Sequence, residues 1–217
     1  MERFPEPSRP QTRQEELANS ISHGLGAAGA LVSLPLLIGH AREQGGRTSS
    51  VVGAAVFGAA ALLLYLASAL YHALPQGKAK RAVRIVEHSA IFLLIAGTYT
   101  PFTLGVLRDS GGGRLASLVW GLAAAGVALE IRHRTRFSGL AIGLYLAMGW
   151  SALLAIRPLL ALMPRNGLLL LVLGGVSYTA GLAFYGAERL RYGHFVWHLF
   201  VLAGTAMHFC AVLWYAG

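Results

Sequence analysis

Seven apolar stretches, each close to the roughly 20 residues that a helix needs to cross the hydrocarbon core of a bilayer, account for most of this 217-residue chain. They run over 21–40, 50–73, 86–107, 114–131, 137–156, 168–187 and 193–215. Charged residues make up only 12% of the chain, about half the roughly 25% usual in soluble proteins. The sequence therefore predicts an all-α bundle of seven transmembrane helices, and it excludes a water-soluble globule or a disordered chain.

The first 20 residues differ from the rest because they are polar and contain prolines. They lack the short apolar core of a secretory signal peptide. We therefore expect a polar tail over 1–20 and one transmembrane domain over 21–217. The only cysteine, Cys210, excludes a disulfide framework or a thiolate metal cluster within one chain.

The formal net charge of +9 is distributed unevenly between the two sides of the predicted bundle. Twelve basic residues fall on the side of the N-terminus and six on the other. The twelve are Arg3, Arg9, Arg13, Lys78, Lys80, Arg81, Arg84, Arg132, Arg134, Arg136, Arg189 and Arg191. By the positive-inside rule, the N-terminus is predicted to be cytoplasmic and the C-terminus external, in a multi-pass protein of the inner (plasma) membrane. Because the charges are dispersed among loops, nucleic acid is not an expected partner.

Ionisable side chains at membrane depth are costly and mark functional sites, and four of the predicted helices bring polar residues to one cytoplasmic layer. The residues are Glu16, Asn19 and His23 at the first span, Ser68 and His72 at the second, Glu87 and His88 at the third, and His194 and His198 at the seventh. Their convergence follows from the predicted topology alone and indicates a candidate site.

The spacing of these residues points to a metal ion. His194 and His198 are four residues apart and lie on one helix face, and two imidazoles one turn apart can bind one ion. A third ligand from another helix, with water in the fourth position, is typical of catalytic zinc, and His72 is the natural third ligand. A histidine near a helix end is more often hydrogen-bonded or interfacial than a ligand, so the pair alone leaves a structural role open.

Other polar and small residues have simpler interpretations. His208 lies about 21 Å from His194 along the helix, so we expect it to be packed away from the site. His88 is assigned a structural role, and Glu130, beside an arginine, is interpreted as a solvated loop charge. Gly139 and Gly143 form a GxxxG step, which is expected to pack against another helix within the molecule.

Four segments of the chain carry a family resemblance: EELANSISH, SALYH, EHSAIFLLIAGTYTPF and GHFVWHLFVLAGTAMHF. They resemble the E-x-x-N-x-x-x-H, S-x-x-x-H, third-span and final H-x-x-x-H motifs of the hemolysin III family, within the progestin and adipoQ receptor superfamily of seven-transmembrane proteins. The motifs occur in order, on the right spans and over nearly the whole chain. One departure is Glu87, where the family usually has Asp, so the carboxylate reaches one methylene further.

The resemblance implies a Zn²⁺ ion bound by three histidines and a metal-dependent activity on lipid amide bonds, like that of the alkaline ceramidases in the superfamily. Carried over residue by residue, the ligands would be His72, His194 and His198, with Ser68 and Glu87 beside the zinc-bound water and Glu16, Asn19 and His23 as supporting polar residues. Glu87 would act as general base, and Ser68 would hydrogen-bond the developing oxyanion.

These observations favour a zinc-dependent hydrolase that acts on membrane lipids and adjusts membrane composition. One alternative is a non-enzymatic sensor or receptor, in which structural zinc joins the second and seventh spans. Another is a pore-forming cytolysin, which is disfavoured because a secreted toxin is expected to carry an export signal. The sequence leaves the substrate and the oligomeric state open.

Overall fold

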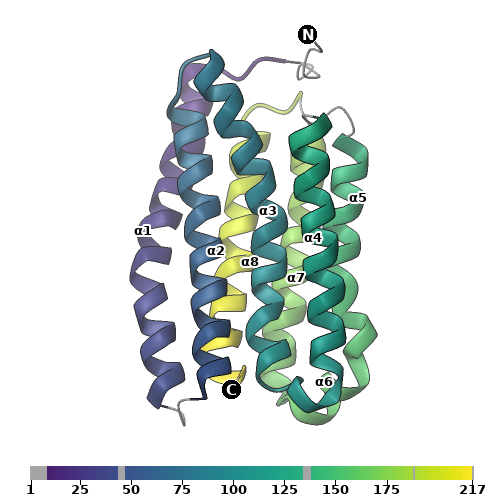
Figure 1. Cartoon of the computed structure of the whole chain (residues 1–217). Helices are drawn as coiled ribbons and strands as arrows, with labels where there is room; N and C mark the ends of the chain where they lie inside the picture. Colours follow the sequence, from purple (N-terminus) through teal and green to yellow (C-terminus); the bar gives the residue numbers. More distant parts are fainter. Residues whose placement is uncertain (1–8, 44–46, 134–137, 188, 217) are drawn as a thin grey trace.

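The computed structural model describes residues 9–43, 47–133, 138–187 and 189–216. Within those ranges the secondary structure is helical, without strands, and seven segments are long and apolar enough to cross a membrane. The segments pack side by side in an up-and-down bundle, with the two ends of the chain at opposite ends of it (Figure 1). The predicted all-α fold with seven transmembrane helices is confirmed.

The first four spans are single helices. They are α1 (Arg13–Glu43), α2 (Thr48–Ala73), α3 (Lys78–Leu104) and α4 (Gly113–His133), the last preceded by a π-helical turn, η1 (Arg108–Gly112). The fifth span consists of α5 (Ser138–Gly149), the 3-10 segment η2 (Trp150–Ala155) and α6 (Ile156–Leu162). The last two spans are α7 (Arg165–Gly186) and α8 (Gly193–Tyr215). Because α1 begins at Arg13, the end of the expected polar tail is helical.

The break in the fifth span has an identifiable cause. Pro158 has no backbone N–H to donate to the carbonyl of Leu154, so the α-helical ladder is interrupted at this point. The Tyr99 hydroxyl on α3 accepts a hydrogen bond from the Ala152 amide (2.9 Å) and lies 2.7 Å from the Gly149 carbonyl oxygen, to which it can donate. Tyr99 therefore satisfies polar backbone groups that the break leaves open.

Small residues bring α2 and α3 close together. A Cβ atom on Gly53 would lie 2.7 Å from the Cα atom of Pro101, so only glycine fits there. Gly139 and Gly143 have no such neighbours, since a Cβ atom on either would meet nothing within 4 Å. The expectation that this GxxxG step packs within the molecule is therefore wrong.

The outside of the bundle is apolar, as expected for lipid contact, with Leu154 75% and Leu25 70% exposed. One predicted surface charge lies inside instead. Glu130 is only 3% exposed, and its Oε1 lies 3.3 Å from Nδ1 of His88. The interpretation of Glu130 as a solvated loop charge is wrong, because α4 continues to His133 and carries Glu130 against α3.

Candidate metal centre

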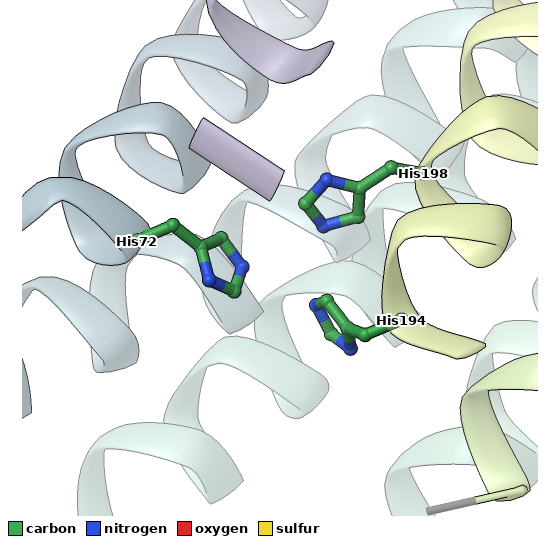
Figure 2. Close-up of side chains that lie close together, drawn as sticks. All are labelled: His72, His194 and His198. Atoms are coloured by element: carbon green, nitrogen blue, oxygen red, sulfur yellow. The ribbon is translucent and has the colours of Figure 1, made fainter. Parts of the chain in front are cut away.

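Three histidines from two helices converge at the end of the bundle where α1 begins. His72 lies in the last turn of α2, and His194 and His198 lie in the first two turns of α8. One ring nitrogen from each residue can be chosen so that all three lie within 4.8 Å of one another. Figure 2 shows the three rings turned toward a common point from opposite sides. The structure thus brings together the three ligands proposed from the sequence.

His72 is oriented by a carboxylate on α1. Its Nδ1 lies 2.7 Å from Oε2 of Glu16, to which it donates. Its Nε2 is buried and has no hydrogen-bond partner among the described residues. A histidine that donates one ring N–H to a carboxylate and keeps the other nitrogen free is the usual arrangement of a metal ligand. The unpartnered Nε2 therefore fits a bound metal ion.

His198 is held in a similar way by the backbone of α1. Its Nδ1 lies 3.3 Å from the Asn19 carbonyl oxygen and 3.1 Å from the Ser22 hydroxyl. Because a carbonyl can only accept, Nδ1 carries the proton, and Nε2 has a lone pair available for a metal. The side chain is 1% exposed. Both His72 and His198 are thus oriented from α1, which contributes none of the three proposed ligands.

The two residues predicted to act on the substrate lie at the same place. Ser68, one turn before His72, is 1% exposed, and its hydroxyl has no hydrogen-bond partner among the described residues. Glu87 on α3 is 7% exposed, and its Oε1 lies 3.7 Å from Nε2 of His72. A free hydroxyl and a carboxylate beside three imidazoles suit a metal ion with an open position for water.

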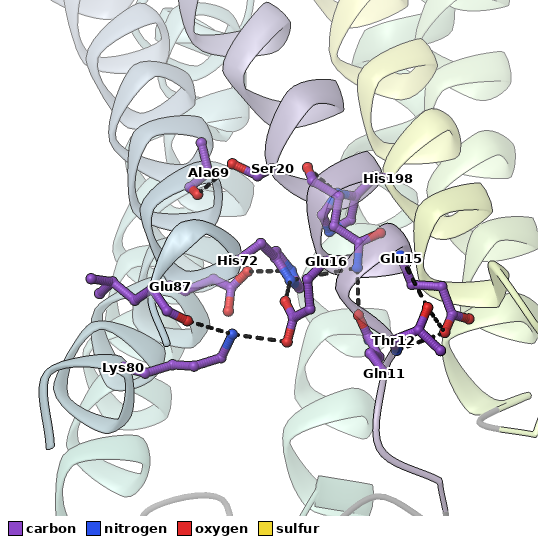
Figure 3. A network of polar contacts seen from close by, with 12 residues as sticks. Gln11, Thr12, Glu15, Glu16, Ser20, Ala69, His72, Lys80, Glu87 and His198 are labelled. Atoms are coloured by element: carbon purple, nitrogen blue, oxygen red, sulfur yellow. Dashed lines mark hydrogen bonds and ion pairs between the residues drawn. The ribbon is translucent and has the colours of Figure 1, made fainter. Parts of the chain in front are cut away.

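Glu16 lies in a network of polar contacts around His72 (Figure 3), and the other two supporting residues, Asn19 and His23, contact the same region. Asn19 is fully buried, and its Nδ2 donates to Oε1 of Gln11 (2.6 Å) and lies 3.5 Å from Nδ1 of His72. The His23 ring stacks on that of His198, with centroids 3.5 Å apart and an interplanar angle of 5°. The E-x-x-N-x-x-x-H segment therefore contacts two of the three candidate ligands.

Lys80 is a member of this network that the sequence analysis missed. The side chain is only 4% exposed. Its Nζ donates to Oε1 of Glu16 (2.8 Å) and lies 4.5 Å from the centroid of the Tyr71 ring. The sequence analysis counted Lys80 as a loop charge. Its spacing of seven residues from Glu87, which places both on one face of α3, is the signal that could have found it.

A cavity of about 220 Å³ adjoins the candidate metal centre. Glu87, His194 and His198 line one end, and its wall continues between α3, the fifth span, α7 and α8 to Phe102 and Leu159. Most of the lining is aliphatic or aromatic. His208 lines the same cavity away from the three ligands, as its position along α8 predicts. An elongated apolar space thus runs from the candidate metal centre into the bundle.

Comparisons with known proteins agree with this arrangement. The sequence profile of a family described as Haemolysin-III related matches residues 11–209. The chain is 43% identical over 202 residues to "Hemolysin-3" of Bacillus cereus, covering 93% of this chain and 92% of the relative. It is 42% identical over 204 residues to "Hemolysin-3 homolog" of Bacillus subtilis (strain 168), covering 94% and 95%. The human "Monocyte to macrophage differentiation factor" is 26% identical over 213 residues, covering 93% and 84%.

Proposed function

The chain is a multi-pass membrane protein that belongs to the haemolysin-III related family, and from this premise we propose that it is a zinc-dependent hydrolase of amide or ester bonds in membrane lipids. The observation that carries the proposal is the position of the three histidines, Ser68 and Glu87 at the polar end of an apolar cavity. Polar reactive groups next to an apolar space suit a substrate with a polar head and a long chain.

Zn²⁺ would be bound by one ring nitrogen from each of His72, His194 and His198. A zinc ion bound there supplies Lewis-acid polarisation of a carbonyl group and lowers the pKa of water. The ligand set supports zinc over calcium or magnesium, because imidazole nitrogen suits zinc while those two ions prefer oxygen ligands.

Glu87 would move the proton in the reaction. Water attacks the carbonyl carbon of the lipid, and the Glu87 carboxylate accepts one proton from that water. As the carbon–nitrogen or carbon–oxygen bond breaks, Glu87 returns the proton to the leaving atom, giving a carboxylic acid and an amine or alcohol. The Ser68 hydroxyl donates a hydrogen bond to the carbonyl oxygen while negative charge develops on it.

The substrate class is inferred from the cavity. Aliphatic residues such as Ile95, Leu146 and Leu171 line it, so the cavity offers an acyl chain surroundings as apolar as the bilayer core from which the chain would enter. The N-terminal end of the bundle carries most of the basic residues, which supports a cytoplasmic position for the centre in the inner membrane.

The test is to purify the full chain, place it in lipid nanodiscs and measure release of fatty acid from a panel of N-acyl and O-acyl lipids. Glu87→Gln is expected to keep one zinc per chain and to lower turnover at least about 100-fold. Glu43→Gln, an exposed glutamate at the opposite end of α1, is the matched control and should leave both values unchanged. Equal turnover in the wild type and Glu87→Gln would overturn the hydrolase.

A non-enzymatic sensor is a second candidate, favoured by the origin of the ligands. His72 lies on α2, and His194 and His198 lie on α8, so an ion bound by all three would join these helices. In this case zinc removal changes the distance between labels on α2 and α8, and no lipid in the panel is cleaved.

The names of the two Bacillus relatives favour a third candidate, a cytolytic activity. It predicts leakage of dye from liposomes at nanomolar protein concentration, in the absence of lipid cleavage. Leakage that is equal in the wild type and Glu87→Gln would separate this activity from hydrolysis.

A further inference from the structure

We propose that Glu15 is a positioning residue that joins the start of α1 to the start of α8 and thereby holds His194 and His198 opposite His72. The inference rests on the metal centre proposed above and concerns a residue outside the E-x-x-N-x-x-x-H motif, whose glutamate is Glu16. Glu15 does not contact the three histidines and is assigned no part in the chemistry.

Glu15 is a buried carboxylate with hydrogen bonds from three residues in two separate segments of the chain. It is 3% exposed. Its Oε2 accepts from the amide and the hydroxyl of Thr12, each at 2.9 Å, and from Nη1 of Arg9 at 3.0 Å. Its Oε1 accepts from Nη2 of Arg9 and from the backbone amide of Tyr192, at 2.8 Å. A carboxylate with this many donors is fixed in one orientation.

The two oxygens of Glu15 have separate roles. Thr12 and Glu15 form a capping box, since the Thr12 hydroxyl also accepts from the Glu15 amide at 3.3 Å. That cap uses only Oε2. Oε1 is directed to Tyr192, 177 residues later in the chain, so helix capping alone does not account for it.

Tyr192 is the residue from which α8 begins. Its carbonyl accepts the hydrogen bond of Val196, which makes it the N-cap, and no side chain caps the helix there. Its φ of 59° lies in the left-handed region, which bulky residues rarely adopt. The bond from its amide to Glu15 stabilises this conformation and so sets the direction in which α8 starts, two residues before His194.

The position of α8 relative to α1 matters because α1 orients ligands from both sides of the centre. Glu16 orients His72, and the Asn19 carbonyl and Ser22 hydroxyl contact His198. These contacts can form at the same time only if the first turn of α8 is correctly positioned along α1 and correctly oriented relative to it. Glu15 lies next to Glu16 on α1 (Figure 3), and its hydrogen bond from the Tyr192 amide ties the start of α8 to this part of α1.

The experiment uses the full chain in nanodiscs, loaded with zinc alone or with Co²⁺ as a spectroscopic probe. Glu15→Gln replaces one acceptor oxygen by an NH₂ group, so the single remaining oxygen cannot accept both from Thr12 and from the Tyr192 amide. We expect zinc to transfer to a chelator at least about tenfold faster than from the wild type, with altered d–d absorption bands of bound Co²⁺. Thr12→Ala removes part of the cap and keeps the Tyr192 bond, so it should lower thermal stability while leaving zinc transfer within about twofold of wild type.

A rescue variant tests the mechanism itself. Glycine adopts a left-handed conformation without steric cost, so Tyr192→Gly in the Glu15→Gln background should restore most of the zinc retention and the Co²⁺ spectrum. If Glu15→Gln does not fold, Arg9→Ala takes its place and is expected to speed zinc transfer at least about threefold by releasing one side of the carboxylate.

The outcomes are distinguishable. A wild type that binds zinc, together with a Glu15→Gln or Arg9→Ala variant of unchanged transfer rate and Co²⁺ spectrum, overturns this inference and leaves the metal centre intact. A wild type that binds no zinc overturns both. Faster transfer that Tyr192→Gly does not reverse also overturns the inference, because Glu15 would then act by another route.

Discussion

The two helices that carry the candidate ligands, α2 and α8, and the two spans that close one side of the cavity, the fifth span and α7, are buried to different extents. In the most apolar part of α2, 50% of the residues lie inside the protein, compared with 17% in the fifth span and 22% in α7. The ligand-bearing helix α8 is intermediate, at 39%. The ligands therefore lie on interior helices, while the cavity is closed on one side by helices that mostly face lipid.

The polar side-chain contacts around the candidate metal centre also differ from those beside the cavity. Around the centre, His72, Glu16 and Lys80 form a connected chain of short contacts across three helices. Beside the cavity, a side-chain hydrogen bond between η2 and α7 joins Trp150, which is 38% exposed, to the exposed Thr179. The difference suggests a division between a rigid region that would hold the proposed metal ion and a more compliant region that would accept the proposed lipid chain. Substitutions should separate the two properties.

The largest effect is expected from a ligand itself. His198→Ala removes a buried nitrogen that no neighbour can replace, so zinc affinity should fall by more than about 100-fold, beyond the range typical of outer-shell partners. His208→Ala, on the same helix but in the cavity, is the control and should keep one zinc per chain. Metal analysis of the purified proteins measures both. If His198→Ala still bound one zinc per chain, the assignment of His198 as a ligand would be wrong.

A smaller effect on zinc affinity is expected at Glu16, which forms a hydrogen bond with the candidate ligand His72. Glu16→Ala removes the acceptor of His72 and should weaken zinc binding about 10- to 100-fold. It also leaves the Lys80 ammonium buried without its carboxylate, which costs up to about 3 kcal/mol of stability, since Glu16 is partly exposed.

The double variant Glu16→Ala with Lys80→Met separates these effects. It removes the buried charge, so thermal stability should recover while zinc affinity stays low. Chelator competition and thermal unfolding are the two measurements. Recovery of zinc affinity in the double variant would show that Lys80, and not the orientation of His72, accounts for the loss.

The sequence predicted the fold and the cluster of three histidines because both follow from local patterns and from the order of the spans. Apolar length defines a membrane span in any context, and the spacing of His194 and His198 fixes their common helix face. The motif residues Glu16, Asn19 and His23 were likewise placed in the layer where the structure has them. The roles of Ser68 and Glu87 stay predictions.

The sequence could not predict contacts set by tertiary packing. Lys80 lies 64 residues from Glu16, and next to other basic residues it looked like a loop charge. Glu130 was misinterpreted for the same reason, since the length of α4 and its contact with His88 decide its burial. Gly139 and Gly143 matched a packing motif, but that motif does not specify which helix lies opposite.

The next prediction is that the cavity can be altered without affecting the candidate metal centre. Gly175 lines it, and a Cβ atom there meets nothing within 4 Å, so Gly175→Leu should fit and occupy part of the space for a chain. We expect kcat/KM for lipid cleavage to fall about tenfold, because the new side chain takes up space that the acyl chain would occupy, with zinc content unchanged. Gly139→Leu is the matched control, because Gly139 is equally open but lies outside the cavity. A loss of zinc in Gly175→Leu would mean that the two regions are not separable.

The smallest effect is expected at the contact between η2 and α7. Trp150 Nε1 donates to Oγ1 of Thr179 at 3.2 Å, and hydrogen bonds between membrane helices contribute only about 0.6 kcal/mol on average. A double-mutant cycle with Trp150→Phe and Thr179→Val should therefore give a coupling energy of about 0.6 kcal/mol in unfolding. Because the contact lies on the lipid-facing wall, its loss should leave zinc affinity unchanged and alter the rate of lipid cleavage by no more than about threefold. A coupling energy above about 2 kcal/mol would show that this wall is held as firmly as the metal centre, and the proposed division between a rigid and a compliant region would fail.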